Sequence, residues 1–319
     1  MTAVPVSPAA RAAAASRRGT PRTARVRDAR ERLIRGALAG CALLSVVTTF
    51  AIVGILAGET VRFLGMPEVS VAEFLTGTTW SPLLEKQFGI WPLVCGTLLV
   101  TAIAAAFALP VGLVTAIYLS EYAPSRVRTA VKPALEVLAG IPTVVYGYFA
   151  LAVITPFLHD HVSEGFGTFN ALGAGLAVGI MILPIVASLS EDALRAVPRS
   201  LRDAAYAMGG TRFDVSVKVV VPAALSGIMA SWLLAITRAI GETMIVALAA
   251  GGKAALTLDP QAEVQTMTAW MVQIFLGDAP ATGVEYRSSY AVAAVLFVIT
   301  LGLTVTGNLI LRRFREEYD

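Results

Sequence analysis

Apolar residues gather in six long stretches along the chain, and polar residues fill the segments between them. A hydrocarbon core about 30 Å thick needs roughly 20 apolar residues in each helix that crosses it, and every stretch reaches that length. The pattern predicts an all-α integral membrane protein with six transmembrane helices. The predicted spans are Ile34 to Gly58, Ile90 to Leu119, Val131 to Leu158, Asn170 to Leu189, Ala223 to Ala250 and Ser289 to Leu311.

The composition agrees with solvation by lipid. Of the 319 residues, 56% are hydrophobic and only 15% are charged, and the mean hydropathy is +0.72. A soluble globule of this size needs more polar surface than these residues provide. The lipid bilayer is therefore the first expected partner.

The basic residues collect on one side of the predicted topology. Nine precede Leu38, three lie in 121–132, five lie in 191–221 and three follow Leu311, which makes twenty of the 25. The segments on the other side hold only four, namely Arg62, Lys86, Lys253 and Arg287. Because Lys and Arg are retained on the cytoplasmic side of a membrane, we expect both ends of the chain in the cytoplasm.

Two regions follow from this pattern. Residues 1–31 combine arginines with many Ala, Ser and Pro residues, which is typical of a disordered cytoplasmic tail that is attracted to anionic lipid. Residues 32–319 form the transmembrane domain. We expect no nucleic-acid partner for the basic tail.

The longest inner loop, 191–222, contains a short amphipathic helix. The pattern predicts it over Arg199 to Met208, and the pair Gly209-Gly210 would end it. The predicted apolar face gathers Leu201, Ala204, Ala205 and Met208, and the residues facing elsewhere are Arg195, Arg202 and Asp203. Such a helix can insert into a groove of another protein or lie on the membrane surface.

The run LRDAAYAMGGTRFDVSVKVVVPAAL resembles the coupling-loop signature of ABC importer permeases. The acidic residue, the two alanines, the glycine and the final proline all match its spacing. Asp203 stands where that family usually has Glu. The resemblance implies that this helix seats in a cleft on a cytoplasmic ATPase through the matching residues Asp203, Ala204, Ala205, Gly209 and Pro222.

The sequence does not encode its own ATPase site. A phosphate-cradling loop has the pattern G-x-x-x-x-G-K-[ST], and the chain lacks it. The nearest fragment, Gly251-Gly252-Lys253, has neither the upstream glycine nor the hydroxyl residue. We expect a subunit that is not an enzyme and that depends on a separate ATPase.

Four further stretches resemble the PstC-type permeases of phosphate importers. They are PLVCGTLLVTAIAAAFALPVGLVTAIYLSEYAP, LEVLAGIPTVVYGYFAL, GIMILPIVASLSEDAL and TRAIGETMIVALAAGG. The resemblance implies an ABC importer permease bundle in the bacterial cytoplasmic (inner) membrane. It implies as partners a second permease of the PstA type, an ATPase dimer of the PstB type and an external phosphate-binding protein of the PstS type, acting together to import inorganic phosphate.

Two charged residues stand within the fifth predicted span, Arg238 and, one turn later, Glu242. An arginine at the bilayer centre costs about 2.5 to 3.5 kcal/mol on insertion scales, so it should face the bundle interior or a wet cavity. Its guanidinium presents a planar fork of donors that suits a tetrahedral oxyanion.

We therefore expect a substrate pathway along Arg238, Glu242, Thr237 and Thr243. In this hypothesis Arg238 attracts the anion, and Glu242 competes for the guanidinium and keeps binding weak enough for release. The alternative is an i, i+4 ion pair that only neutralises two buried charges. The order of the two residues favours that pair less, because an acidic residue placed before the basic one makes the better helical pair.

Other polar residues offer no metal or cofactor site. Cys41 and Cys95 lie inside predicted spans and should behave as small apolar residues, and His159 and His161 have no further ligand nearby. Three acidic residues at span edges are expected to be solvated or to cap helices, namely Glu136, Glu191 and Asp192.

Two competing functions remain at this stage. A permease for another oxyanion, such as sulfate, molybdate or phosphonate, could use the same arginine. An ion-coupled secondary transporter would need no ATPase, but it predicts paired half-helices in inverted repeats, and the sequence contains no convincing internal repeat.

Overall fold

The computed structural model describes residues 21–278, 280 and 282–313, with side-chain surroundings from Arg30 to Arg312. Almost all regular structure in these residues is helical. The exception is a pair of two-residue antiparallel strands, β1 (Trp80–Ser81) and β2 (Gln87–Phe88). The all-α prediction is confirmed.

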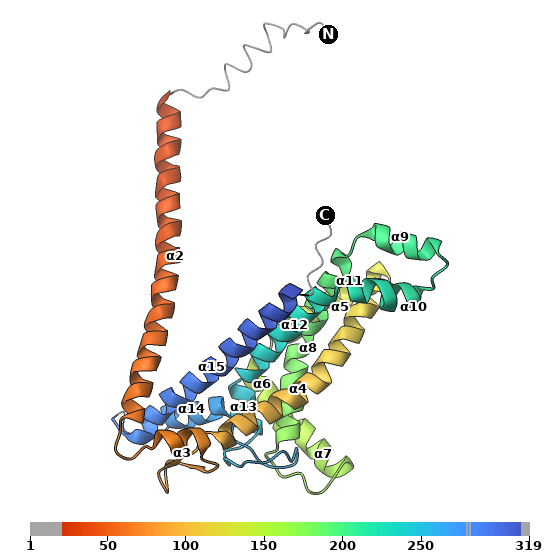
Figure 1. Cartoon of the computed structure of the whole chain (residues 1–319). Helices are drawn as coiled ribbons and strands as arrows, with labels where there is room; N and C mark the ends of the chain where they lie inside the picture. The colour runs from red at the N-terminus through yellow and green to blue at the C-terminus, as the bar shows by residue number, and fades with distance from the viewer. Residues whose placement is uncertain (1–20, 279, 281, 314–319) are drawn as a thin grey trace, which may run out of the picture. The chain divides into compact units, whose positions relative to one another are not determined.

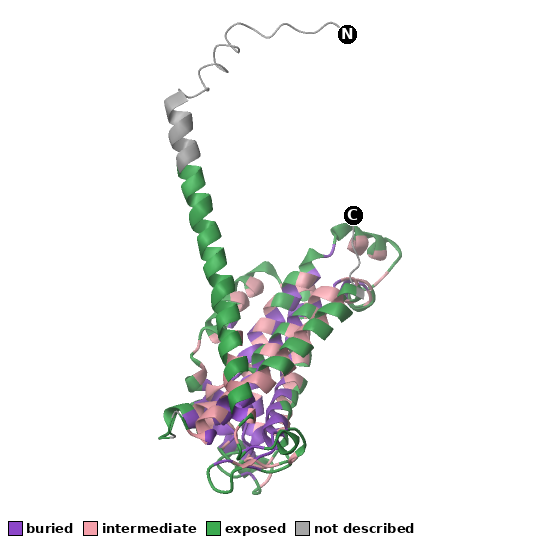
Figure 2. Cartoon of the chain, turned by 60° about the vertical axis from the view of Figure 1, so that its left-hand side comes forward, coloured by how far each residue is buried: buried purple, intermediate pink, exposed green. Residues whose placement is uncertain are grey.

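The first predicted span lies within one long helix, α2 (Pro21–Leu64). The helix begins inside the predicted tail, whose residues 1–20 lie outside the described residues. Up to Ala57 the chain forms a unit of its own, and nearly every described side chain there is exposed (Figure 2). Exposed apolar groups such as Phe50, at 73%, are those of a helix solvated by lipid.

The unit that starts at Gly58 is built around four helices. They are α4 (Trp91–Ile117), α8 (Ala171–Ala196), α12 (Leu225–Ile240) and α15 (Val284–Arg313). Figure 1 shows them running between two ends of this unit. The α9 end carries α9 (Arg199–Ala207) and α10 (Arg212–Val215), and the α14 end carries α3 (Val71–Thr76) and α14 (Met267–Leu276).

Small residues bring α4 and α8 together. Ala104 of α4 and Ala177 and Val178 of α8 are wholly buried, and a Cβ added to Gly175 would meet Ile103 Cγ2 at 2.6 Å. Close approach of helix backbones through small residues is a common way to pack helices in a membrane. This contact forms the centre of the largest apolar core.

The third predicted span is bent rather than continuous. Helix α5 (Ser125–Ala139) ends at Gly140, and a 91° bend follows before the chain continues through α6 (Thr143–Phe149). Pro142 stands at the N-cap of α6, where it cannot continue the preceding helix. The chain then passes through a π-helical turn, η2 (Ala150–Ile154), into α7 (Thr155–His161).

The fifth predicted span is interrupted as well. Helix α12 ends at Ile240, and a short helix, α13 (Met244–Ala249), follows after a three-residue break. Before α12 the chain runs through η3 (Ser216–Val220) and α11 (Val221–Ala223) and bends by 69°.

The number of crossings depends on how these bends are counted. Within the residues that the structure describes, four helices are long and apolar enough to cross a membrane singly, and the number reaches six if each bent pair forms one span. The six predicted spans therefore correspond to four continuous helices and two broken ones.

The segment before α14 packs directly on α4, which the sequence did not predict. The Met267 backbone N–H donates to Thr97 Oγ1 at 3.0 Å. A Cβ added to Gly96 would collide with the carbonyl oxygen of Gln265. This loop is thus part of the core at the α14 end rather than a free connection.

We expect Gly96→Ala to destabilise the folded chain by about 1 to 3 kcal/mol, the usual cost of overpacking a core, because the obstructing atom belongs to the backbone. The matched control is Gly302→Ala in α15, where an added Cβ meets nothing within 4 Å. Thermal unfolding in detergent measures both variants. If Gly96→Ala melted at the same temperature as the control, the close contact between Gly96 and the Gln265 carbonyl would be contradicted.

Candidate anion path and coupling surface

Arg238 lies in the last turn of α12, beside the helix break. The sequence predicted Arg238 near the middle of a continuous span. This prediction is wrong, because α12 ends at Ile240, two residues after Arg238. Arg238 Nη1 donates to Glu242 Oε2 at 2.7 Å. The two side chains differ in burial, with 41% of Arg238 exposed and 2% of Glu242.

Three oxygen atoms of Glu242 bond to the residues on either side of the break and to α14. Its Oε2 accepts from Arg238, and its Oε1 accepts from the backbone N–H groups of Met244 at 3.1 Å and Ile245 at 3.4 Å, in the first turn of α13. Its carbonyl accepts from Thr268 Oγ1 of α14 at 2.6 Å. The carboxylate therefore serves α12 and α13 at once.

The guanidinium of Arg238 keeps donors that have no acceptor in the described part of the chain. Among the described residues, no acceptor bonds to its Nε or Nη2. A guanidinium bonded on one nitrogen can still offer a fork of donors to an oxyanion. Thr237 and Thr243 are half-buried, and their hydroxyls donate to the backbone carbonyls of Leu233 and Gly241.

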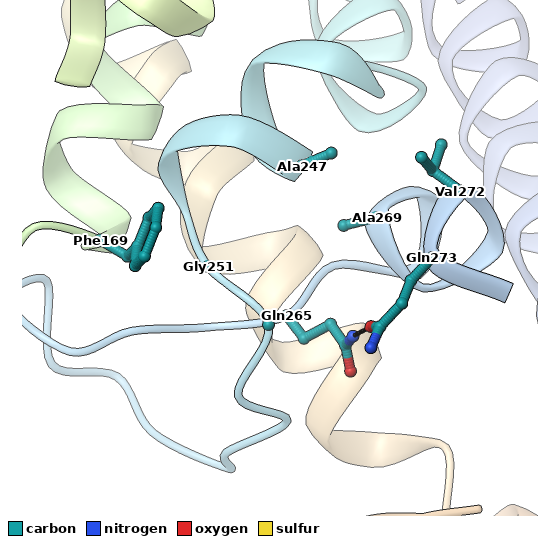
Figure 3. A pocket seen from close by; sticks show the side chains of 8 residues that line it. Phe169, Ala247, Gly251, Gln265, Ala269, Val272 and Gln273 are labelled. Atoms are coloured by element: carbon teal, nitrogen blue, oxygen red, sulfur yellow. Dashed lines mark hydrogen bonds between the residues drawn. The ribbon is translucent and has the colours of Figure 1, made fainter. Parts of the chain in front are cut away.

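A cavity of about 270 Å³ lies between α13 and α14. Figure 3 shows Ala247 and Ala269 on its two walls and the pair Gln265 and Gln273, whose side chains are joined by a hydrogen bond of 2.6 Å. Its lining residues are Phe169, Ala247, Gly251, Gly252, Gln265, Ala269, Val272 and Gln273. None of them is charged, and Arg238 is not among them.

The predicted coupling helix is present as α9, and it ends where the sequence indicated. Gly209 adopts a φ of +83°, a backbone conformation that glycine reaches without strain. Its N–H donates to the Tyr206 carbonyl at 2.9 Å, and the Gly210 N–H donates to the Ala205 carbonyl at 3.1 Å. This pair of bonds is a Schellman motif, which satisfies the last carbonyls of the helix.

The predicted faces of α9 were partly wrong. Leu201 and Ala205 are half-buried and pack on the apolar cluster around Val215 and Val220. Ala204 is exposed instead, and Met208, which follows the last residue of α9, is 90% exposed.

Four of the five predicted coupling residues are exposed. They are Asp203, Ala204, Gly209 and Pro222. Only Ala205 is turned toward the chain's own core. Pro222 lies in α11, just before the bend into α12.

Glu191 is wholly buried, contrary to the solvated or capping role that the sequence indicated. Helix α8 continues to Ala196, so the first six residues of the predicted loop are helical. Three cations surround its carboxylate, Arg128 at 3.4 Å, Lys132 at 3.3 Å and Arg195 at 3.6 Å. They compensate a charge that would otherwise be costly to bury.

Residues 108–315 match the family described as the binding-protein-dependent transport system inner membrane component. The match spans more than half of the chain. The chain belongs to this family of transport-system membrane components. Membership and the apolar helices establish a multi-pass inner membrane protein.

Relatives cover most of this chain and most of their own length. The chain is 33% identical to the probable ABC transporter permease protein YqgH of Bacillus subtilis, over 82% of this chain and 84% of that protein. It is 35% identical to the phosphate transport system permease protein PstC of Mesorhizobium japonicum, over 75% and 78%.

Among solved structures, a bacterial alginate ABC transporter in complex with a pentasaccharide-bound periplasmic protein is similar in fold. Its TM-score is 0.64 at 14% identity, and the alignment covers 89% of this chain and 95% of that one. At this identity the likeness supports the permease fold alone.

Proposed function

We propose that this chain is the permease subunit that forms the anion path of an ATP-driven importer of inorganic phosphate. The observation that carries the proposal is Arg238, whose guanidinium stands at a helix break with donors that no described residue occupies and that suit an oxyanion. The likeness to proteins named as phosphate transport permeases supports phosphate as the anion.

The pathway works through competition for one guanidinium. An entering phosphate bonds to the free edge of Arg238, and Glu242 keeps the other edge through its 2.7 Å bond. Because Glu242 is 2% exposed and also caps α13, it stays in place while the anion comes and goes. The shared guanidinium holds the anion weakly enough for release.

The remaining subunits follow from the family and from the exposed surface of α9. A second permease of the PstA type completes the path, a PstB-type ATPase dimer receives α9, and a PstS-type binding protein delivers phosphate at the α14 end. The α9 end and both termini are cytoplasmic, as the distribution of basic residues indicates. ATP binding closes the ATPase dimer, moves α9 and rocks the helices between outward and inward openings.

Competition in cells tests the choice of anion. In a strain whose only phosphate importer contains this chain, excess unlabelled phosphate should abolish uptake of labelled phosphate, and equal excess of sulfate, molybdate or phosphonate should leave it unchanged. A strain without this chain provides the control. Strong inhibition by one of the other oxyanions, with weak inhibition by phosphate, would assign the path to that anion.

A further inference from the structure

Arg202 of α9 points into the chain, although its neighbours Asp203 and Ala204 are exposed. Its side chain is 16% exposed. Its position in the helix explains the direction, because Arg202 follows Leu201 by one residue and precedes Ala205 by three. At 3.6 residues per turn, these three residues share the side that packs on the chain's own core.

The guanidinium of Arg202 joins α9 to two other elements. Its Nη2 and Nε donate to the two carboxylate oxygens of Glu121, at 3.1 Å and 3.4 Å. Glu121 belongs to η1 (Tyr118–Tyr122), the π-helical turn that ends α4. Nη1 and Nη2 also donate to the carbonyls of Val197 at 2.5 Å and Leu194 at 2.8 Å, at the C-terminal end of α8.

The turn η1 is held from a second direction by Arg128 of α5. Nε and Nη2 of Arg128 donate to the Leu119 carbonyl at 3.1 Å and 2.8 Å. The same Nε lies 3.4 Å from Glu191 on α8. The end of α4 therefore sits between two arginines, one of which is carried by α9.

Burial distinguishes this contact from an ordinary surface ion pair. Glu121 is 9% exposed in its side chain, so its charge is little screened by water, and an exposed pair would contribute little. A lysine could not replace Arg202 fully, because four bonds to three residues need the planar fork of a guanidinium.

We propose that Arg202 is a positioning residue that transmits the displacement of α9 to the ends of α4 and α8. The inference rests on the proposed function, in which α9 moves with the ATPase. When α9 shifts, the bonds of Arg202 carry η1 and the α8 end with it, and α4 and α8 follow because they pack closely on each other, as at Gly112 with Val186 and at Gly175 with Ile103. Without these bonds, α9 follows the ATPase while α4 stays behind.

The experiment separates coupling from docking. The whole importer is reconstituted in proteoliposomes with the Arg202→Gln chain. Three quantities are measured: the amount of ATPase subunit that copurifies with the chain, the ATP hydrolysed and the labelled phosphate imported. We expect normal retention and a drop of about tenfold in phosphate imported per ATP, within the range that residues of coupling networks produce. Glu121→Gln should lower the phosphate imported per ATP by a similar factor, and Arg202→Lys should give a value between Arg202→Gln and the unaltered chain. The exchanged pair, Arg202→Glu with Glu121→Arg, should recover part of this ratio.

The matched control is Arg126→Gln, an exposed arginine on α5 and outside α9, which should keep the normal ratio. An unchanged ratio in Arg202→Gln would overturn the inference. So would a loss of ATPase retention that parallels the loss of import, or no recovery in the exchanged pair, because each makes the contact merely structural. A wild-type importer that accumulates no phosphate would instead refute the proposed function, before any variant is compared.

Discussion

Replacing Arg238 with alanine is expected to lower phosphate import by the assembled complex at least about 100-fold, because it leaves the carboxylate of Glu242, which is 2% exposed, without its cation, and truncating a charge partner in this way costs about 2 to 5 kcal/mol. The anion would also lose its only charged partner identified on α12. Import of labelled phosphate, divided by the amount of complex in the membrane, measures the effect. Leu234→Ala, one turn earlier on α12 and 53% exposed, is the control and should import normally.

A double variant distinguishes the path from simple charge neutralisation. Arg238→Ala alone leaves Glu242 buried without its cation, so a disturbed fold around α13 is a second route to a loss of import. Arg238→Ala with Glu242→Gln removes both charges, and the amide oxygen can still accept from the N–H groups of Met244 and Ile245. If the pair only neutralises charge, this double variant should import at the normal rate, whereas the path hypothesis predicts that it stays inactive.

Ala204→Trp is expected to release the ATPase from the complex. Ala204 is small and lies on the exposed side of α9, where a bulky side chain would hold a partner away from the helix. We expect retention of the ATPase on the affinity-purified chain to fall at least about tenfold, since well-packed interface positions cost 2 kcal/mol or more when they are altered. Import should fall in parallel.

The control for this prediction is Ala196→Trp, an exposed alanine in the last turn of α8. It adds the same side chain outside α9 and should keep the ATPase bound. Normal retention in Ala204→Trp would show that the exposed face of α9 is not the docking surface. Loss in both variants would show a general effect of tryptophan near this loop.

Hydrophobic length and local capping signals made much of the fold predictable. The apolar stretches located the long helices, because lipid imposes a minimum length on each. The short helix α9 was predicted almost to the residue, from Arg199 to Met208, because the Gly209-Gly210 pair ends a helix through local geometry alone.

The break after α12 was not predictable from the sequence. No proline stands between Ile240 and Met244, and the apolar pattern resumes at Met244 after only three residues, Gly241, Glu242 and Thr243. The break is held by local bonds of the Glu242 carboxylate and also by a contact between distant segments, the bond from Thr268 to the Glu242 carbonyl. The position of Arg238 at a helix end could therefore be learned only from the structure.

Two charged residues show the same limit at the α9 end. The sequence pattern placed Arg202 away from the apolar side of α9, but its side chain turns inward to Glu121, which is 81 residues away. Glu191 was expected to be solvated because it is charged and near a span end, yet Arg128 and Lys132 from α5 make its burial possible. Compensation by residues distant in the chain leaves no local pattern in the sequence.

The most direct test of the central claim measures labelled phosphate accumulated in proteoliposomes that contain the complete importer, with and without ATP on the α9 side. The account predicts accumulation only when ATP, the ATPase and the binding protein are all present. It also predicts that the Arg238→Ala with Glu242→Gln complex hydrolyses ATP but accumulates no phosphate. Accumulation driven by an ion gradient in the absence of ATP, or normal accumulation by the double variant, would contradict it.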